Sequence, residues 1–411
     1  MSPPTARSCL ERGLTLRTPR MRRSEFHLSQ AIPLAISPFD GSELTAPLSL
    51  IEKTGTDAIL FLTLYPNQDN DNSWDLIKDS DLEKLAWQLG NITAPELSNR
   101  RVMLRYAPEF NGNWFHYSQQ PQRFVTEWKR LVDKVRSVTK RVAFVWSPNA
   151  GNNYPFGGNY LPKVDLATLD TNKDGKFDIN DDPYTPYYPG DDYVDWVGMS
   201  VYWKGDPALG YPTKDNSKAP GDYWSAMVEG SPSTLSNPKF PFYDMFAQGH
   251  NKPLVMSEGG GAFAVSQGPT PETPLPANAG QLAIQQSFWQ TYLNASHITA
   301  YPKAKMFMNF EFYRKQEDPT GGNNGVTRDY RITWEPTVVA ALKADLNALG
   351  SSLVWANAVT PGGGSSGPAP TGSSGGVAPV NSATTTSKSG AAPFVSTAAT
   401  LVGALAVAFM V

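Results

Sequence analysis

The chain has very little cysteine and histidine. Cysteine occurs once among 411 residues, at Cys9, so a disulfide framework and a thiolate metal centre are both excluded. Histidine occurs four times, and none of the four belongs to an HExxH or similar paired-ligand spacing. We therefore expect neither a zinc enzyme nor any cofactor for catalysis.

An excess of charge of one sign is also missing. The chain has 35 Lys and Arg against 38 Asp and Glu, which gives a net charge of -3 and a pI near 5.9. No basic surface points to nucleic acid, and a neutral substrate fits this balance. The hydrophobic share of 40% is enough for one large core. The 11 Trp and 17 Tyr suit stacking on sugar rings, although large cores also use Trp.

The C-terminal part changes composition abruptly after Trp355. Residues 358–392 are rich in Ser, Gly, Pro and Thr and cannot bury enough apolar surface to fold, so we expect a linker. Residues 393–411 form an apolar tail with no charge behind it. The tail follows a polar spacer and the small residues Asn381, Ser382 and Ala383. This order is typical of a glycosylphosphatidylinositol (GPI) attachment signal, in which the tail is removed.

A membrane-spanning tail anchor is the alternative, but such a helix needs about 20 strongly apolar residues and this tail is rich in Ala and Thr. We expect a secreted protein at the cell surface, anchored to the membrane or cell wall only through lipid. Residues 1–24 do not fit this expectation, because secretion needs a signal peptide and these residues carry many Arg and no apolar signal-peptide core. They are either a basic leader for an organelle or, as we favour, a sign that the true N-terminus is missing.

Seven short apolar runs recur between residues 31 and 310. They are continuous rather than alternating, as expected for parallel strands covered on both faces. The runs start at Ala31, Asp57, Arg101, Arg141, Tyr193, Pro253 and Ala304. Between them lie helix-like segments with apolar residues three and four apart, such as 121–138.

This alternation predicts a (β/α)8 TIM barrel in residues 25–357, after a doubtful segment 1–24. Such a barrel needs eight strands, and no run before Phe26 supplies another, so the first strand would precede the present start. An open doubly wound sheet is the alternative, but it would lack a glycine-rich phosphate loop here.

Two carboxylates close apolar strands. Glu109 ends RVMLRYAPE and Glu258 ends PLVMSE, and the carboxyl ends of barrel strands meet at one face. Glycoside hydrolysis needs such a pair, one group to protonate the leaving oxygen and one to attack or to activate water. A lone Glu at a strand end is more often a surface or ion-paired residue.

The flanking residues favour the functional interpretation of both carboxylates. After Glu109, Asn111 and Gly112 allow a tight turn and Trp114 offers a stacking surface. The glycines at 259–261 would let a sugar approach the backbone, although glycine runs are usually only loops.

The segments RYAPEFNGNW, FVWSPN, DDYVDWVGMSVYW and MSEGG resemble, in order, motifs of glycoside hydrolase family 26, of fungal type, from about Phe26 to Trp334. The resemblance implies a clan A barrel that acts with retention, with Glu109 as acid/base and Glu258 as nucleophile. It also implies that Trp114 and Tyr202 line the sugar site and that Tyr202 hydrogen-bonds the nucleophile.

We expect a monomer that cleaves internal bonds of a β-linked polysaccharide through a covalent glycosyl-enzyme intermediate, and the resemblance implies β-1,4-mannan as the first candidate. One departure is Pro108, where the family's mannanases usually carry His. A wall β-glucan hydrolase or transglycosylase is therefore a second hypothesis. A third is a non-catalytic carbohydrate-binding wall protein, against which the two retained carboxylates argue.

Four further residues are candidates for substrate contact. Arg105 precedes Glu109 on the same strand face and could hold a carboxylate ionised or form a structural ion pair. Trp146, Asn149 and Phe310 lie at strand ends, although each alone is more often core or loop scaffold. Retention predicts carboxyl groups about 5 to 5.5 Å apart.

The segment DTNKDGKFDIND, residues 170–181, has the spacing of a calcium loop of the EF-hand type. Oxygen ligands would come from Asp170, Asn172, Asp174, the Lys176 carbonyl, Asp178 and Asp181, with Gly175 at the sharp turn. Asp181 replaces the usual Glu, and no regular helix is evident after it. We expect a structural Ca²⁺ that fixes a long loop; a merely acidic, solvated loop is the alternative.

Overall fold

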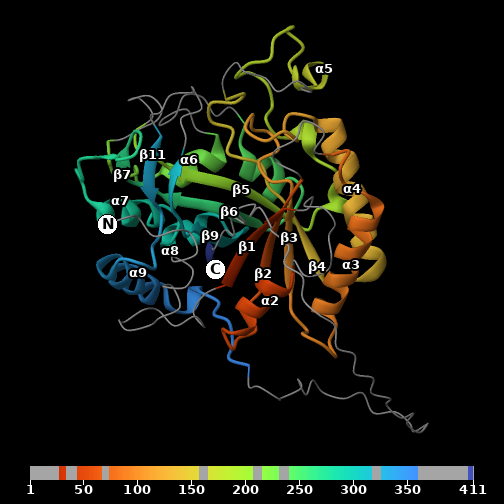
Figure 1. The fold of residues 1–411 in the computed structure, drawn as a ribbon. Coiled ribbons are helices and arrows are strands. Elements are labelled where there is room, and N and C mark those ends of the chain that lie inside the picture. Colours follow the sequence, from red (N-terminus) through yellow and green to blue (C-terminus); the bar gives the residue numbers. More distant parts are fainter. Residues whose placement is uncertain are drawn as a thin grey trace.

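Seven parallel strands form most of a closed barrel in the computed structural model (Figure 1). They are β1 (His27–Pro33), β2 (Leu60–Tyr65), β3 (Val102–Tyr106), β4 (Val142–Trp146), β5 (Trp196–Trp203), β6 (Leu254–Gly261) and β9 (Ala304–Phe310). Each successive pair is parallel. All seven predicted strands are therefore confirmed, and so is the (β/α)8 class.

The structure describes residues 27–33, 44–66, 74–156, 165–206, 215–230, 240–316, 325–359 and 406–410. The expected segment 1–24 and almost all of the expected linker 358–392 lie outside the described residues.

The eighth place in the barrel differs from the prediction. It is taken by β12 (Ala406–Met410), from the apolar tail, which pairs antiparallel with β1 on one side and β9 on the other. The unpaired edges of two neighbouring strands can accept an apolar segment in either direction, since both directions satisfy the backbone groups. The tail therefore supplies the strand that the sequence analysis expected before residue 25.

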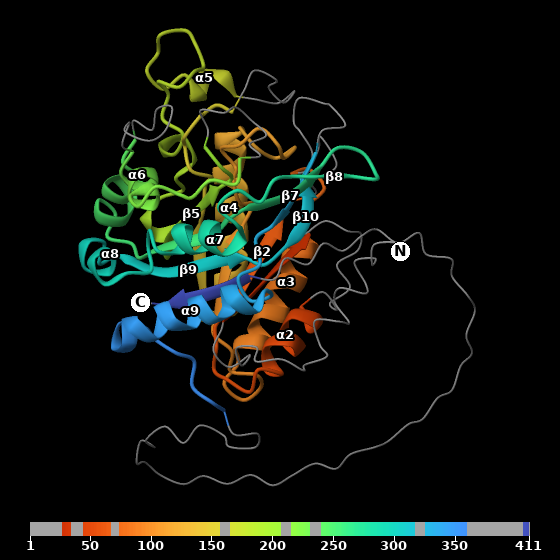
Figure 2. The same cartoon turned by 90° about the vertical axis from the view of Figure 1, so that its left-hand side faces the viewer.

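Helices cover the outside of the barrel (Figures 1 and 2). The helices are α2 (Thr45–Glu52), α3 (Asp79–Thr93), α4 (Pro121–Val138), α5 (Leu166–Leu169), α6 (Tyr223–Glu229), α7 (Gln281–Trp289), α8 (Ala295–Ala300) and α9 (Pro336–Leu349). Short 3-10 turns occur at Thr185–Tyr187, Asp191–Tyr193 and Gly350–Ser352, and a π-helix at Tyr243–Gln248. Within the described ranges, no helix is both long and apolar enough to cross a membrane.

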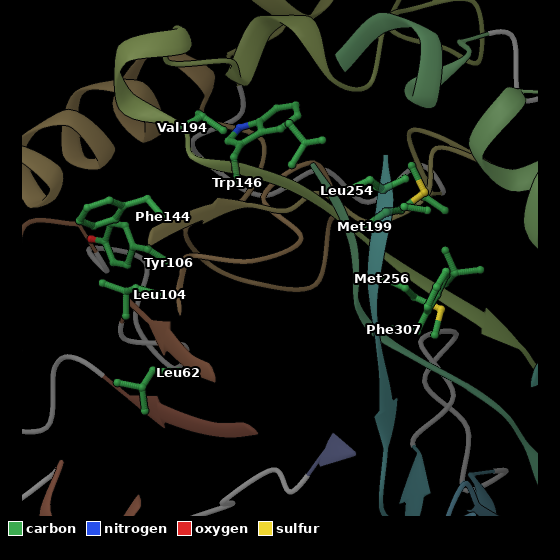
Figure 3. Close-up of a cluster of buried hydrophobic side chains, with 14 of the residues drawn as sticks. Leu62, Leu104, Tyr106, Phe144, Trp146, Val194, Met199, Leu254, Met256 and Phe307 are labelled. Atoms are coloured by element: carbon green, nitrogen blue, oxygen red, sulfur yellow. The ribbon is translucent and has the colours of Figure 1, made fainter. Parts of the chain in front are cut away.

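Strand residues alternate between two apolar layers. Outward residues such as Leu62, Leu104 and Phe144, which are labelled in Figure 3, belong to one large core cluster with buried residues of the helices. Inward residues form a second cluster in the barrel lumen: Ile59, Phe61, Met103, Val145, Val255, Met306 and Met308. Because successive residues alternate between the faces, this pattern decides which strand-end residues can reach the barrel mouth.

A small antiparallel sheet stands beside the barrel and was not predicted. It contains β7 (Phe263–Gln267), β8 (Thr273–Pro274), β10 (Tyr313–Gln316) and β11 (Val326–Asp329), in the order β10-β11-β7-β8. Since β7 directly follows β6 and β10 directly follows β9, the sheet extends from the carboxyl ends of these barrel strands (Figure 2).

The three glycines after Glu258 meet protein atoms. A Cβ on Gly259 would lie 2.4 Å from the carbonyl oxygen of Val201, and one on Gly261 would lie 2.9 Å from the Cβ of Phe288. On Gly260 it would lie 3.1 Å from the Tyr330 ring. Close packing of β6 against its neighbours, rather than room for a sugar, therefore requires glycine here.

Gly259→Ala should destabilise the fold by about 1–3 kcal/mol, because the added methyl group overlaps β5. The measurement is urea unfolding. Gly221→Ala is the matched control, since its Cβ would meet nothing within 4 Å. Equal stability of the two variants would contradict this account of the packing.

Candidate active site

The polar residues at the carboxyl end of the lumen form one hydrogen-bonded group around Arg105. The Arg105 side chain is 1% exposed. It donates from Nη1 to Glu258 Oε2 at 2.6 Å, from Nη2 to Ser200 Oγ at 2.7 Å and from Nε to Ser147 Oγ at 3.1 Å. Arg105 therefore points into the barrel and pairs with Glu258, while its contact with substrate stays a prediction.

Glu258 reaches this group because of a β-bulge. In the β5–β6 ladder Met199 faces Met256 but Ser200 faces Glu258, so Ser257 is the extra residue. Ser257 Oγ lies 2.5 Å from Ser147 Oγ, so both Ser257 and Glu258 have inward partners. A regular strand would turn one of the two outward, and bulges commonly re-aim side chains in this way.

Both oxygens of the Glu258 carboxylate accept strong hydrogen bonds. Arg105 donates to Oε2, and the Tyr202 hydroxyl donates to Oε1 at 2.5 Å. Charge-assisted bonds of this kind fix the orientation of a carboxylate and stabilise its ionised form. The predicted contact of Tyr202 with Glu258 is confirmed.

Glu109 projects from an irregular turn after β3. Ala107 and Glu109 have backbone φ angles of 44° and 55°, which residues other than glycine rarely adopt. The turn is held by Glu109 N donating to the Ser147 carbonyl at 2.9 Å and by the Tyr117 hydroxyl donating to the Pro108 carbonyl at 2.7 Å. Backbone strain of this kind is stored at functional sites.

The pKa of Glu109 is raised above its ordinary value. Burial is the largest cause and the charge of Glu258 the second, while Arg105 and hydrogen bonds from Ser200 and Trp114 act in the opposite direction. The two carboxyl groups therefore have different environments, since Glu109 holds its proton more firmly than an ordinary carboxyl and Glu258 accepts hydrogen bonds from Arg105 and Tyr202. Pairs of this kind carry out acid/base and nucleophilic work at one site.

Trp114 lies against the backbone of its own turn. Its indole Nε1 donates to Glu109 Oε2 at 2.9 Å, and the side chain is 42% exposed. A Cβ on Gly112 would lie 2.5 Å from the indole ring, so the tryptophan can take this position only beside glycine. The exposed indole lies next to Glu109, and the predicted contact of Trp114 with a sugar stays a prediction.

Three other predicted contacts have different outcomes. Trp146 is fully buried, donates to the Tyr187 carbonyl at 3.0 Å and stacks on Phe242, so its assignment as a substrate contact is wrong. Since Val145 faces the lumen, strand alternation turns Trp146 to the helix layer.

The main chain of Asn149 is bonded to the side chain of Asn111: its carbonyl accepts from Asn111 Nδ2 at 2.9 Å, and its N–H donates to Asn111 Oδ1 at 2.8 Å. The Asn149 side-chain amide donates to the Ala150 carbonyl. Phe310 is 8% exposed and packs edge-on against Tyr202. Phe310 is thus part of the packing around Tyr202, while Asn149 is half-buried and its contact with substrate stays a prediction.

The sequence analysis missed several inward residues, Tyr65, Ser147, Ser200 and Lys204. Burial, followed by the charge of Glu258, raises the pKa of the Tyr65 hydroxyl, which also lies near Arg105 and Glu109. Burial is likewise the largest cause that lowers the pKa of Lys204 to about 8. Following the inward alternation to the end of each strand would have identified these residues.

In the predicted calcium loop, carboxylates accept backbone hydrogen bonds. Asp170 accepts from Asp174 N and Gly175 N, and Asp181 accepts from Thr171 N and Asp178 N. Among the residues that the structure describes, no group of three or more His, Cys, Asp or Glu side chains is arranged to hold a metal ion. Calcium binding by Asp170, Asn172, Asp174, Lys176, Asp178 and Asp181 stays a prediction.

No family model matches the chain, and no curated protein does either. Among solved structures, the chain is similar to the catalytic domain of a family 26 endo-β-1,4-mannanase from Bacillus sp. JAMB-750, at 17% identity and a TM-score of 0.43 over 74% of this chain and 70% of that one. A family 26 β-mannanase from Bacteroides ovatus has 13% identity and a TM-score of 0.35 over 56% of this chain and 61% of that one. A modular endo-β-1,4-mannanase from Cellulomonas fimi has 12% identity and a TM-score of 0.40 over 68% of this chain and 56% of that one.

The chain thus spans about three fifths of the Bacteroides ovatus protein. At these identities and scores a shared activity does not follow from the likeness.

Glu109→Gln should raise the melting temperature at neutral pH. The Glu109 pKa is higher in the folded than in the unfolded state, so this carboxyl favours folding least once the pH exceeds both values. The gain should shrink as the pH falls to about 4, the ordinary range of a carboxyl pKa. Thermal unfolding from pH 4 to 8, with the exposed residue Glu96→Gln as control, measures this. A difference in melting temperature between Glu109→Gln and the wild type that does not change with pH would contradict the raised pKa of Glu109.

Proposed function

We propose that this chain is a retaining glycoside hydrolase that cleaves internal bonds of a β-linked polysaccharide, with β-1,4-mannan as the first candidate substrate. One observation carries the proposal. Two carboxyl groups lie in one hydrogen-bonded group at the barrel mouth, Glu258 held by Arg105 and Tyr202 and Glu109 with a raised pKa. Retaining hydrolysis needs one ionised and one protonated carboxyl group.

In the first step, Glu258 attacks the anomeric carbon, and Glu109 gives its proton to the departing glycosidic oxygen. A covalent glycosyl ester forms, and the negative charge of Glu258 is lost. Because that charge is one cause of the raised Glu109 pKa, its loss lowers the pKa of Glu109. Glu109 can then accept a proton from the water that attacks the ester, which restores both groups.

Trp114 would contribute on the leaving-group side. Its indole bonds to the acid carboxyl and presents a partly exposed aromatic face next to it. Aromatic faces stack on the apolar faces of pyranose rings. The sugar that departs would therefore rest on Trp114 while Glu109 protonates its oxygen.

The choice of mannan rests on the sequence resemblance alone, and Pro108 favours a second candidate. The Pro108 carbonyl is taken by the Tyr117 hydroxyl, and its ring offers no donor or acceptor to a sugar. A wall β-glucan hydrolase or transglycosylase would not need the histidine that mannanases carry there. Calcium has no part in either mechanism.

Glu258→Ala should abolish turnover on a panel of mannans, lichenan and β-1,3-glucan. Glu109→Gln should lower kcat/KM on these polysaccharides by about 10²–10⁴-fold, because the proton donor is lost. On an aryl glycoside whose leaving group needs no proton, the first step of this variant should stay fast. Reducing-end release and a burst of phenol measure the two effects.

Glu96→Gln, which changes an exposed carboxyl, is the control for both variants. Turnover that persists in Glu258→Ala would reject the mechanism. A wild-type protein without turnover on any substrate would favour a carbohydrate-binding wall protein.

We also propose that the mature protein is a monomer held at the cell surface by a GPI anchor, on the composition of residues 358–411. In that case residues 406–410 would be cleaved off, so β12 and the anchor are alternative fates of the same segment. Mass spectrometry of the mature C-terminus should find lipid attached near residues 381–383, and phosphatidylinositol-specific phospholipase C should release the protein. A mature chain that still contains residues 406–410 would rule the anchor out.

A further inference from the structure

Two arginines stand directly opposite one another on the small sheet. In the antiparallel pair of β10 and β11, Arg314 faces Arg328. Side chains directly opposite share one face of a sheet, and like charges there are destabilising. Arg328 is fully buried and Arg314 is exposed. The register therefore places two positive charges side by side on one face of the sheet, one buried and one exposed.

The face that carries the two arginines is turned towards Glu258. Arg328 and the Tyr330 hydroxyl both donate to Gln316 Oε1, at 3.2 and 2.6 Å. The Tyr330 ring packs against Tyr202, with ring centroids 5.5 Å apart, and Tyr202 donates to Glu258. The next residues along the strands, Tyr313 and Asp329, lie on the opposite face of the sheet.

A third cation lies on the same side of the site. Lys204 follows β5, and its Nζ is 5.2 Å from the centroid of the Tyr202 ring. Burial is the first cause that lowers its pKa and Arg328 the second; Arg314 also lowers the pKa, while Glu109 and Glu258 raise it. Lys204, Arg314 and Arg328 therefore lie within electrostatic reach of one another, and we call them the cationic cluster.

The two carboxylates do not need this cluster for charge balance. Arg105 already pairs with Glu258, and Glu109 holds its proton more firmly than an ordinary carboxyl. The chain as a whole is slightly acidic, at -3, so three cations together are a local feature. In the part of the chain that the structure describes, no hydrogen bond or ion pair occupies the Arg314 guanidinium.

We propose that the cationic cluster is a subsite for an anionic sugar unit on the glycone side of the cleavage point, with Arg314 as its direct contact. The inference rests on the proposed function, because it names the substrate class of the same site. The departing sugar lies by Glu109, so the sheet that continues β6 borders the sugars that stay bound to Glu258. A guanidinium fork binds planar oxyanions with two parallel hydrogen bonds.

The oxyanion can come from a uronic acid carboxylate or from a phosphate ester on the sugar. Arg314 would supply the hydrogen bonds, while Arg328 and Lys204 would supply positive potential from partly desolvated positions. Such a site discriminates by charge, so neutral and acidic versions of one glycan should differ in affinity. The neutral substrate that the net charge suggested would then be the weaker ligand.

The test measures binding separately from turnover, by isothermal titration calorimetry. The ligands are β-1,4-mannotetraose, the same tetramer oxidised to a uronic acid at its non-reducing end, and the same tetramer with a 6-phosphate there. The three matched forms of cellotetraose repeat the comparison on a glucan backbone. The proteins are the wild type, Arg314→Gln and Lys315→Gln.

Lys315 is the matched control, because it lies on the same strand but on the opposite face, where its Nζ donates to the Gly268 carbonyl at 2.7 Å. At low salt an acidic tetramer should bind the wild type about tenfold more tightly than its neutral form, as expected for a charged hydrogen-bonded contact. Arg314→Gln should lose this preference, Lys315→Gln should keep it, and added salt should reduce it.

A preference for the uronate or for the phosphate identifies the source of the oxyanion. Equal binding of the acidic and neutral tetramers, binding of none of them, or an Arg314→Gln variant that keeps the preference would overturn the subsite. Turnover of the same ligands tests the hydrolase separately. Hydrolysis without a charge preference removes only the subsite, and a preference that depends on Arg314 without hydrolysis removes only the hydrolase.

Discussion

The ion pair between Arg105 and Glu258 is the interaction on which the site depends. A buried guanidinium with three bonded partners joins β3 to β5, to β6 and to the end of β4, so the carboxyl ends of four strands are held in register by one side chain. Removing one member of such a pair leaves an uncompensated buried charge, typically at a cost of about 3–5 kcal/mol. The same contact that orients Glu258 therefore also stabilises the barrel mouth.

The position of Glu109 follows from a different constraint. Its turn is strained, and main-chain contacts keep it in place: Glu109 N donates to the Ser147 carbonyl, and the Tyr117 hydroxyl donates to the Pro108 carbonyl. Burial and the neighbouring negative charge then raise its pKa. The orientation of Glu258 is thus set by direct hydrogen bonds, whereas the raised pKa of Glu109 comes mainly from its burial.

Strands and carboxylates could be predicted from the sequence, because continuous apolar runs identify buried parallel strands and a polar residue that ends such a run reaches the barrel mouth. Trp146 was misassigned because strand-end position was used without alternation, and its neighbour Val145 decides the face. The β6 bulge, the small sheet and the antiparallel β12 depend on ladder register between distant segments. Short-range sequence patterns do not contain that information.

The extra residue in β6 separates two properties of that strand. Leu254, Val255 and Met256 pack into the apolar layers and hold the barrel together, whereas the bulge after them lets two successive side chains, Ser257 and Glu258, face the lumen. In a regular ladder with the same residues, Ser257 would stand opposite Ser200, and Glu258 would turn into the layer beneath the helices. The direction in which this carboxylate points therefore depends on the register between two strands, with the glutamate itself unchanged in the sequence.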